Sequence, residues 1–216
     1  MAIFARKMAH ILESCCTSTE QALSAIRNGA GRIELCSCIE VGGITPPDSD
    51  ISRTVALGTP VNVLVRPRGG DFVFSPEEEA QMLRSIECCR ELGAAGVVIG
   101  ALTQEGDIDI PMMRRLVAAA HGGSRPLSVT FHRAFDECRE PFKALEEIIS
   151  LGCERLLTSG QKPSAQEGME LIAELVKRAD GRIIVMPGAG ITPDNLALIE
   201  KQTGAVEFHG TRICRK

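Results

Sequence analysis

Residues 60–101, with the sequence PVNVLVRPRGGDFVFSPEEEAQMLRSIECCRELGAAGVVIGA, contain one complete strand–helix–strand pattern. The run PVNVLVR (60–66) is short, apolar and rich in valine, which favours a β-strand. In residues 76–93 apolar residues recur at helical spacing, and acidic residues come early and basic ones late, as the helix dipole favours. The run AGVVIGA (95–101) predicts the next strand. A crossover of this length predicts that the two strands are parallel.

The same alternation extends from this unit towards both ends of the chain. Six further apolar runs predict strands, namely HILESCC (10–16), GRIELCS (31–37), PLSVTFHR (126–133), CERLLTS (153–159), RIIVMPG (182–188) and AVEFHGT (205–211). Eight strands separated by helices require a mostly parallel sheet. A doubly wound sheet is the alternative, but no GxGxxG follows the first strand, where CCTS (15–18) stands instead. We therefore predict an α/β fold, a (β/α)8 or TIM barrel, formed by residues 1–216 as a single domain.

The two ends of the chain carry expectations of their own. The segment MAIFARKMAHILES at the start fits neither a signal peptide nor a membrane span, because its apolar stretches are short and Arg6 and Lys7 interrupt them. After the last predicted strand only ICRK (213–216) remains, which is too little for a closing eighth helix. Three explanations stay open. The barrel is uncovered there, a partner subunit or a swapped segment covers it, or the sequence is a shortened one.

Composition argues against several kinds of partner. A formal net charge of -4 without a basic stripe gives no reason to expect nucleic acid, and seven Phe with no Tyr or Trp offer no base-stacking platform. Nothing in the sequence predicts a membrane partner. The nine cysteines are odd in number and include the neighbouring pairs Cys15–Cys16 and Cys88–Cys89, unlike a disulfide framework. Reduced thiols in the cytoplasm are therefore expected.

Two of the predicted strands carry the same Glu-x-Cys pattern. In the first strand Glu13 and Cys15 share a face, and in the second Glu34 and Cys36 share a face. Consecutive strands of a barrel lie side by side, so two carboxylates and two thiols should approach one another near the carboxyl ends. The alternative for each cysteine is a small buried apolar residue. A buried carboxylate is harder to explain without a cation, a hydrogen-bonding partner or a proton.

Two further strands end in residues that could bind a ligand or take part in catalysis. Arg66 is in phase with the inward positions of its strand, and we expect it to neutralise Glu34 or Glu13, or to bind an anionic ligand. An internal ion-pair network is the alternative for Arg66. His132 ends the fifth strand, where it is a candidate general acid/base or metal ligand, although a histidine can also simply be hydrogen-bonded.

The carboxyl ends of the last two strands resemble a phosphate site. Barrels often bind phosphate through the loops after strands seven and eight, and Gly188, Gly190 and Gly210 suit that role, although such glycines also serve turns alone. His209 lies in the eighth strand and is a further candidate. Lys162 is the one lysine expected near this rim, so a strand-borne Schiff-base lysine is disfavoured.

The sequence resembles the CutC family, the copper homeostasis proteins, over essentially its whole length to residue 210. The matching stretches are RIELC (32–36), GGITP (42–46), VRPRGGDFVFS (65–75), TFHRAFD (130–136), LLTSG (156–160), RIIVMPGAGIT (182–192) and EFHG (207–210). The resemblance implies a TIM barrel, a cytoplasmic location and a homo-oligomer, a dimer or tetramer. It also implies Cu(I) held by Cys15 and Cys36, a ligation that suits soft thiolates.

The sequence departs from the family pattern in three places. Cys16 and Cys38 are additional thiols that could compete for the metal or assist in binding it. Thr211 stands where the family usually has serine, and the usual basic, helical continuation after the last strand is absent.

Two functions follow from these residues. The first is copper homeostasis through Cu(I) binding by strand cysteines, which is the function we assign. The alternative is an isomerase, epimerase or lyase acting on a small anionic substrate, including a phosphorylated one. In the alternative Glu34 or His132 moves the proton and Arg66 holds the anion. Further anion-binding candidates of the enzyme are Arg68, Asp136, Gly188, Gly190 and His209.

Overall fold

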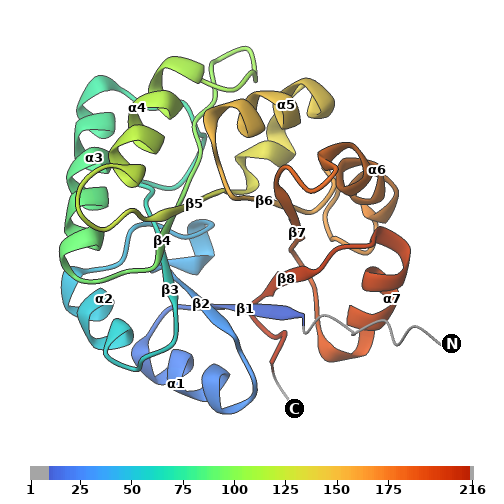
Figure 1. The fold of residues 1–216 in the computed structure, drawn as a ribbon, viewed down its shortest axis with the longest axis horizontal. Coiled ribbons are helices and arrows are strands. Elements are labelled where there is room, and N and C mark those ends of the chain that lie inside the picture. Colours follow the sequence, from blue (N-terminus) through green and yellow to red (C-terminus); the bar gives the residue numbers. More distant parts are fainter. Residues whose placement is uncertain (1–9, 215–216) are drawn as a thin grey trace, which may run out of the picture.

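Eight parallel strands form the centre of the computed structural model, which describes residues 10–214, and seven α-helices of that range pack around them (Figure 1). The strands are β1 (Ile11–Cys16), β2 (Arg32–Leu35), β3 (Val61–Leu64), β4 (Gly96–Ile99), β5 (Ser128–Phe131), β6 (Arg155–Thr158), β7 (Ile184–Pro187) and β8 (Glu207–Gly210). Each lies within the run that predicted it. The TIM-barrel prediction is therefore confirmed.

Helices connect every consecutive pair of strands. They are α1 (Thr19–Arg27), α2 (Asp48–Val55), α3 (Pro76–Glu91), α4 (Ile110–His121), α5 (Pro141–Leu151), α6 (Met169–Ala179) and α7 (Pro193–Thr203), with short 3-10 helices η1 (Ile39–Val41) and η2 (Arg133–Glu137). The sequence sets the start of α3 locally. The Ser75 side chain accepts from the Glu78 backbone, the Glu78 side chain accepts from the Ser75 backbone, and Pro76 occupies the first turn.

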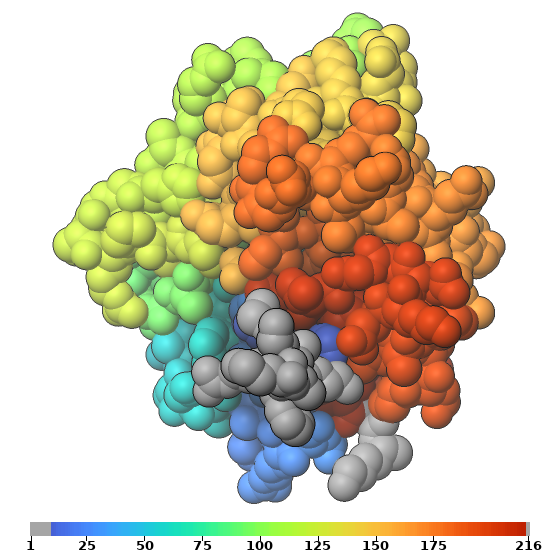
Figure 2. All heavy atoms as spheres, turned by 45° about the vertical axis from the view of Figure 1, so that its right-hand side comes forward, coloured from blue at the N-terminus to red at the C-terminus, as the bar shows by residue number. Residues whose placement is uncertain are grey.

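The strand order is β7-β6-β5-β4-β3-β2-β1-β8, so β7 and β8 are the two edges of the sheet. They lie beside each other in Figure 1, and within residues 10–214 no strand pairing joins them. Figure 2 shows the carboxyl-terminal part of the chain, in red, against the amino-terminal part, in blue, as the β1–β8 pairing requires. The barrel is thus nearly closed, with a seam between β7 and β8.

No helix follows β8 in the described range, where residues 211–214 form bends and turns, as the sequence predicted. The expectation about the start of the chain falls mainly on residues 1–9, which lie outside the described part. Among residues 10–214 no helix has the length and apolar character that a membrane crossing needs.

The main hydrophobic core lies between the strands and the helices, and a small second cluster of Cys15, Cys36, Leu64 and Val98 is separate from it. Outward-facing side chains such as Ile33, Val63 and Val97 are fully buried beneath the helices. The inward-facing side chains of β1 and β2 are mostly polar, and Glu13 and Arg32 are among the most buried groups of the protein. A polar interior has to be held by specific partners, because unpaired charges there are costly.

Candidate functional site

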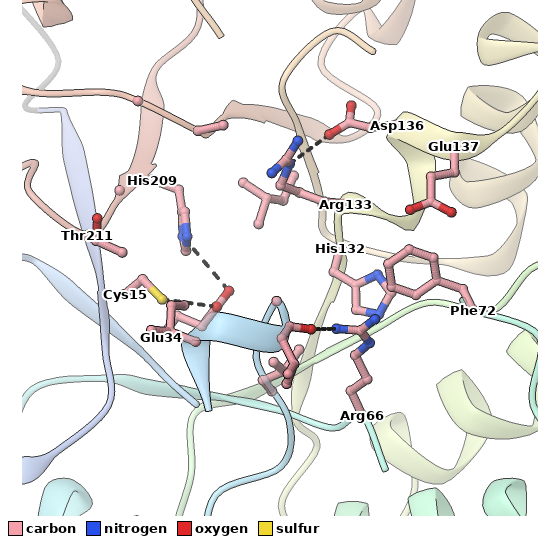
Figure 3. A pocket seen from close by; sticks show the side chains of 18 of the residues that line it. Cys15, Glu34, Arg66, Phe72, His132, Arg133, Asp136, Glu137, His209 and Thr211 are labelled. Atoms are coloured by element: carbon pink, nitrogen blue, oxygen red, sulfur yellow. Dashed lines mark hydrogen bonds and ion pairs between the residues drawn. The ribbon is translucent and has the colours of Figure 1, made fainter. Parts of the chain in front are cut away.

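A cavity of about 870 Å³ opens at the carboxyl ends of the strands. Figure 3 shows its two walls, with Cys15, Glu34 and His209 on one side and Arg66, Phe72 and His132 on the other. Eight of the residues predicted as site residues line the cavity, namely Cys15, Glu34, Arg66, His132, Asp136, Gly190, His209 and Gly210. Cys36, Arg68 and Gly188 are not among the lining residues.

The first wall joins the thiols to a carboxylate and an imidazole. Parallel pairing sets Cys15 opposite Glu34, and the Cys15 Sγ lies 3.7 Å from the Glu34 Oε1 and 3.7 Å from the Cys36 Sγ. One ligand atom each of Cys15, Glu34 and His209 lies within 4.8 Å of the others, an arrangement that could hold a metal ion. The structure thus brings together the two Glu-x-Cys strands, as their phase predicted.

Protonation on this wall follows from burial and neighbouring charges. The hydrogen bond to Cys36, burial and the charge of Glu34 raise the pKa of Cys15 well above its ordinary value. Burial raises the pKa of Glu34. Burial alone would lower the pKa of His209, but Glu34 and Glu13 outweigh it and shift the value upward. Cys15 is therefore a protonated thiol rather than a ready nucleophile in the free protein.

An ion network fills the barrel beneath this wall. Arg32 forms an ion pair with Glu13 through Nε and donates from Nη2 to the Glu207 Oε2 at 2.6 Å. Arg155 donates to the same Glu207 oxygen at 2.8 Å, and the His209 Nδ1 donates to the Glu13 Oε1 at 2.9 Å. Burial would raise the pKa of Glu13, but His209 and Arg32 outweigh it and hold the value at about 2. Glu13 is consequently a buried carboxylate with three partners, because the Asn62 side-chain amide also donates to its Oε2 at 3.1 Å.

The expectation that Arg66 neutralises Glu13 or Glu34 is wrong, because Arg32 pairs with Glu13 and no arginine within residues 10–214 pairs with Glu34. Arg32 was not among the predicted site residues, although it stands two residues before Glu34, on the same face of the strand. That phase is the signal that could have identified it. Of the expectations for Arg66, the binding of an anionic ligand is the one that remains a prediction.

On the second wall Arg66 and His132 flank an aromatic ring. The Arg66 guanidinium lies 4.6 Å from the centre of the Phe72 ring, and the rings of Phe72 and His132 are 4.9 Å apart. Arg66 donates hydrogen bonds to the backbone carbonyls of Val41, Gly43 and Gly70. Burial and, after it, the charge of Arg66 lower the pKa of His132 to about 3.

Asp136 organises the loop after β6. Its carboxylate accepts from the Thr158 hydroxyl at 2.5 Å, from the backbone N–H groups of Ser159 and Gln161, and from the Arg133 Nε at 2.8 Å. Because it accepts hydrogen bonds from so many donors, the Asp136 carboxylate stabilises the loop at the rim of the cavity. Arg133, to which it pairs, lines the cavity and was not singled out from the sequence.

The other predicted anion-binding residues have different positions. Arg68 points away from the cavity and pairs with Asp71 at 2.9 Å and with Glu78 at 2.6 Å. Gly188 packs tightly, since a Cβ there would come within 2.6 Å of Leu157 and 3.4 Å of His209. Gly190 lies on the rim with a positive φ of 77°, a conformation that suits glycine.

These features define a class of protein: a (β/α)8 barrel with a buried thiol, carboxylate and imidazole cluster at the carboxyl ends of its strands. The CutC family model matches residues 10–214, and the chain belongs to this family.

Known proteins agree with this assignment. A CutC family protein of Parabacteroides distasonis is 54% identical over 204 residues, covering 94% of this chain and 82% of the relative. One of Pasteurella multocida is 50% identical over 199 residues, covering 92% and 80%. The solved structure of CutC from Streptococcus agalactiae, a protein named for copper homeostasis, has a TM-score of 0.89 at 32% identity, covering 94% of this chain and 99% of that one. A 2,3-dimethylmalate lyase, 15% identical with a TM-score of 0.70 and covering 94% and 76%, shares the fold alone.

Proposed function

We propose that this protein binds Cu(I) as its cargo in copper homeostasis, with Cys15 and Cys36 as the ligands. The observation that carries the proposal is the distance of 3.7 Å between the sulfur atom of Cys15, which lines the cavity, and that of the buried Cys36. Two sulfurs at about 2.3 Å from one tetrahedral ion would lie about 3.8 Å apart, so the thiol pair could hold a metal with little movement.

The chemistry of the donors supports Cu(I) in particular. Thiolates are soft ligands, and soft ligands select Cu(I) over harder divalent ions. Glu34 and His209 also lie next to Cys15. A site that used these two side chains in place of Cys36 would instead suit Zn(II) or Cu(II). Cys15 lines the cavity whereas Cys36 is almost fully buried, so a metal would reach the pair through the cavity.

The test is an anaerobic titration of Cu(I) against a competing chelator of known affinity. Loss of ligand-supporting contacts alone weakens metal binding about 10–100-fold, so the double variant Cys15→Ser/Cys36→Ser should weaken Cu(I) binding by at least about a hundredfold. Cys88→Ser, which changes a half-buried thiol on α3, is the matched control and should bind as wild type does. Equal Cu(I) affinity of the double variant and wild type would exclude the thiol pair.

A second function is favoured by the size of the cavity, because about 870 Å³ suits a small organic molecule better than a single ion. This candidate is an isomerase, epimerase or lyase acting on a small anion, with Glu34 as the group that moves a proton. Turnover of candidate acids, followed by NMR in the metal-free protein, tests it. Glu34→Gln should abolish turnover, and unchanged turnover in that variant would exclude the assigned role.

Cytoplasmic location and a homo-oligomeric state, a dimer or tetramer, are part of the same proposal. All nine cysteines are free thiols, which a reducing compartment preserves. Light scattering on the purified protein measures the mass of the assembly, and a mass of one chain across the concentration range would exclude the oligomer.

A further inference from the structure

Two buried N–H donors on the second wall of the cavity lack acceptors. Arg66 and His132 are exposed by only 4% and 5%, and both line the cavity. Neither the Arg66 Nε nor the His132 Nε2 has a hydrogen-bond partner within residues 10–214. Burying an N–H donor without an acceptor destabilises the folded protein. Two such donors in one wall indicate that an acceptor comes from outside the chain.

Arg66 also carries a charge that its surroundings do not neutralise. The hydrogen bonds that it donates within the described residues go to backbone carbonyl oxygens, and no carboxylate there forms an ion pair with it. Burial is the main influence on Arg66 and lowers its pKa, although the guanidinium stays charged. Glu137, an exposed residue of η2 that lines the same cavity, and Asp71 supply only longer-range attraction. The unpaired buried cation calls for an anionic partner in the cavity.

The hydrogen bonding of His132 assigns its tautomer. The His132 Nδ1 accepts a hydrogen bond from the backbone N–H of Ala134 at 3.1 Å, at the start of η2. A ring nitrogen that accepts carries no proton, so in the neutral imidazole the proton is on Nε2. Because its pKa is about 3, the ring is neutral at neutral pH. His132 therefore holds a fixed, uncharged N–H donor, itself buried, within the wall that it shares with Arg66 (Figure 3).

We propose that Arg66 and His132 together bind the carboxylate of a small organic acid, with Arg66 supplying the charge and the His132 Nε2–H a neutral hydrogen bond. This inference rests on the second function proposed above, the enzyme acting on a small anion, and it names the chemical class of that anion. The pair contributes one positive charge, which balances a monoanionic carboxylate. A phosphate dianion would leave one negative charge uncompensated on this wall.

The position of the pair distinguishes the carboxylate site from the copper site. Cys15 lies in β1 and Cys36 directly follows β2, whereas Arg66 and His132 follow β3 and β5. Figure 3 shows Cys15 and His132 on different sides of the cavity. A carboxylate held by Arg66 would thus direct the rest of the acid towards the wall that carries Glu34.

The first measurement is a long-range ¹H–¹⁵N correlation spectrum of the histidine rings in the metal-free, full-length protein. The His132 signals, assigned by their loss in His132→Gln, should show the proton on Nε2. Pyruvate and acetate should shift these signals and bind saturably, while acetamide, the uncharged counterpart of acetate, should not. A proton on Nδ1, or signals unmoved by either acid, would overturn the site.

The second measurement is the affinity of the variants for the same two acids. Arg66→Met should weaken binding by about tenfold or more, since a hydrogen bond to a charged group is lost. Arg68→Met removes an arginine two residues away, outside the cavity, and should stay within about twofold of wild type. His132→Gln retains an N–H donor and should bind better than His132→Leu. Equal losses of affinity in Arg66→Met and Arg68→Met would contradict the site. Such losses would come from a general effect on folding rather than from the removal of a contact to the acid.

Inorganic phosphate tests the assignment to a carboxylate. Tighter binding of phosphate than of pyruvate, with the same dependence on Arg66 and His132, would replace the carboxylate with a phosphoryl group. Binding of the acids without turnover of any acid would exclude the enzyme and leave the site intact. Absence of binding beside a normal Cu(I) titration would exclude the site and leave the copper proposal intact.

Discussion

Arg32 holds together the charges inside the barrel, because it is the buried cation between Glu13 and Glu207. Its neighbour on the same face, Glu34, has no comparable cationic partner: burial raises its pKa, and His209 approaches it only to 3.8 Å. Two carboxylates one strand apart therefore have opposite properties. Arg32 and His209 favour the ionised form of Glu13, whereas burial favours the protonated form of Glu34, the carboxylate that the proposed enzyme would use.

Arg32→Met should be strongly destabilising. The variant leaves Glu13 and part of Glu207 buried without their cation, which costs about 3–5 kcal/mol in comparable cases. The free energy of unfolding from urea titration measures the effect. Arg53→Met, which removes an exposed ion pair with Asp50, is the matched control and should cost no more than about 1 kcal/mol. A similar cost for both variants would show that the buried network does not stabilise the barrel.

His132 should make the protein sensitive to acid. Its folded pKa of about 3 lies below the ordinary value of 6.5, so between these values the unfolded chain binds a proton that the folded protein does not. The contribution of His132 is fully present above about pH 6.5 and is lost as the pH falls towards about 3. Between about pH 7 and about pH 4, wild type should lose about 3 kcal/mol more unfolding free energy than His132→Gln. Parallel pH profiles of the two proteins would refute this.

At the scale of elements, the end of strand β4 restricts the position of His132, which directly follows β5. Gly100 stands directly after β4, and a Cβ there would lie 2.6 Å from both Cε1 and Nδ1 of His132. The imidazole cannot simply swing away, because the Ala134 N–H holds its Nδ1. A glycine is therefore needed at this point for close approach between the two strands.

Gly100→Ala should displace His132 and weaken carboxylate binding. We expect a loss of about 1–3 kcal/mol in unfolding free energy, as for other overpacked sites, and a shift of the His132 ring signals in NMR spectra. Gly31→Ala is the control, since a Cβ there meets only Ile11 at 3.7 Å, an ordinary contact. Unchanged ring signals in Gly100→Ala would contradict the role of β4 in placing His132.

For the whole molecule, the seam between β7 and β8 is the place where the barrel lacks a strand pairing. Strands such as β3 and β4 have hydrogen-bonded neighbours on both sides, whereas β8 pairs only with β1 within the described residues. Local opening requires fewer broken hydrogen bonds at such an edge. The seam also lies beside the cavity, because Gly190 and Gly210, which follow β7 and end β8, both line it.

Hydrogen exchange should reveal this asymmetry. Peptides covering β7 and β8 should exchange their amide hydrogens faster than peptides covering β3 and β4 in native conditions. Mass spectrometry of peptic fragments measures the difference, and saturating pyruvate provides a second comparison. Equal protection of β8 and β4 would show that the seam is closed in solution.

Much of the architecture could be predicted because periodicity is a local property. Each of the eight apolar runs contains one strand, and the period of two placed Cys15, Cys36 and Glu34 on inward faces. The start of α3 was likewise readable from Ser75 onward, because a capping box involves neighbours in sequence. These features depend on contacts within a few residues.

Local patterns along the chain therefore specify the barrel and the set of side chains that face its interior. Which of these side chains pair with one another depends on the three-dimensional packing. Arg32 rather than Arg66 neutralises Glu13, because the register between β1 and β2 sets Glu13 opposite Arg32. Arg68 points out of the cavity, because the loop after β3 directs it to Asp71 and Glu78. Register and loop path arise from the packing of all eight strands, and no local pattern encodes them.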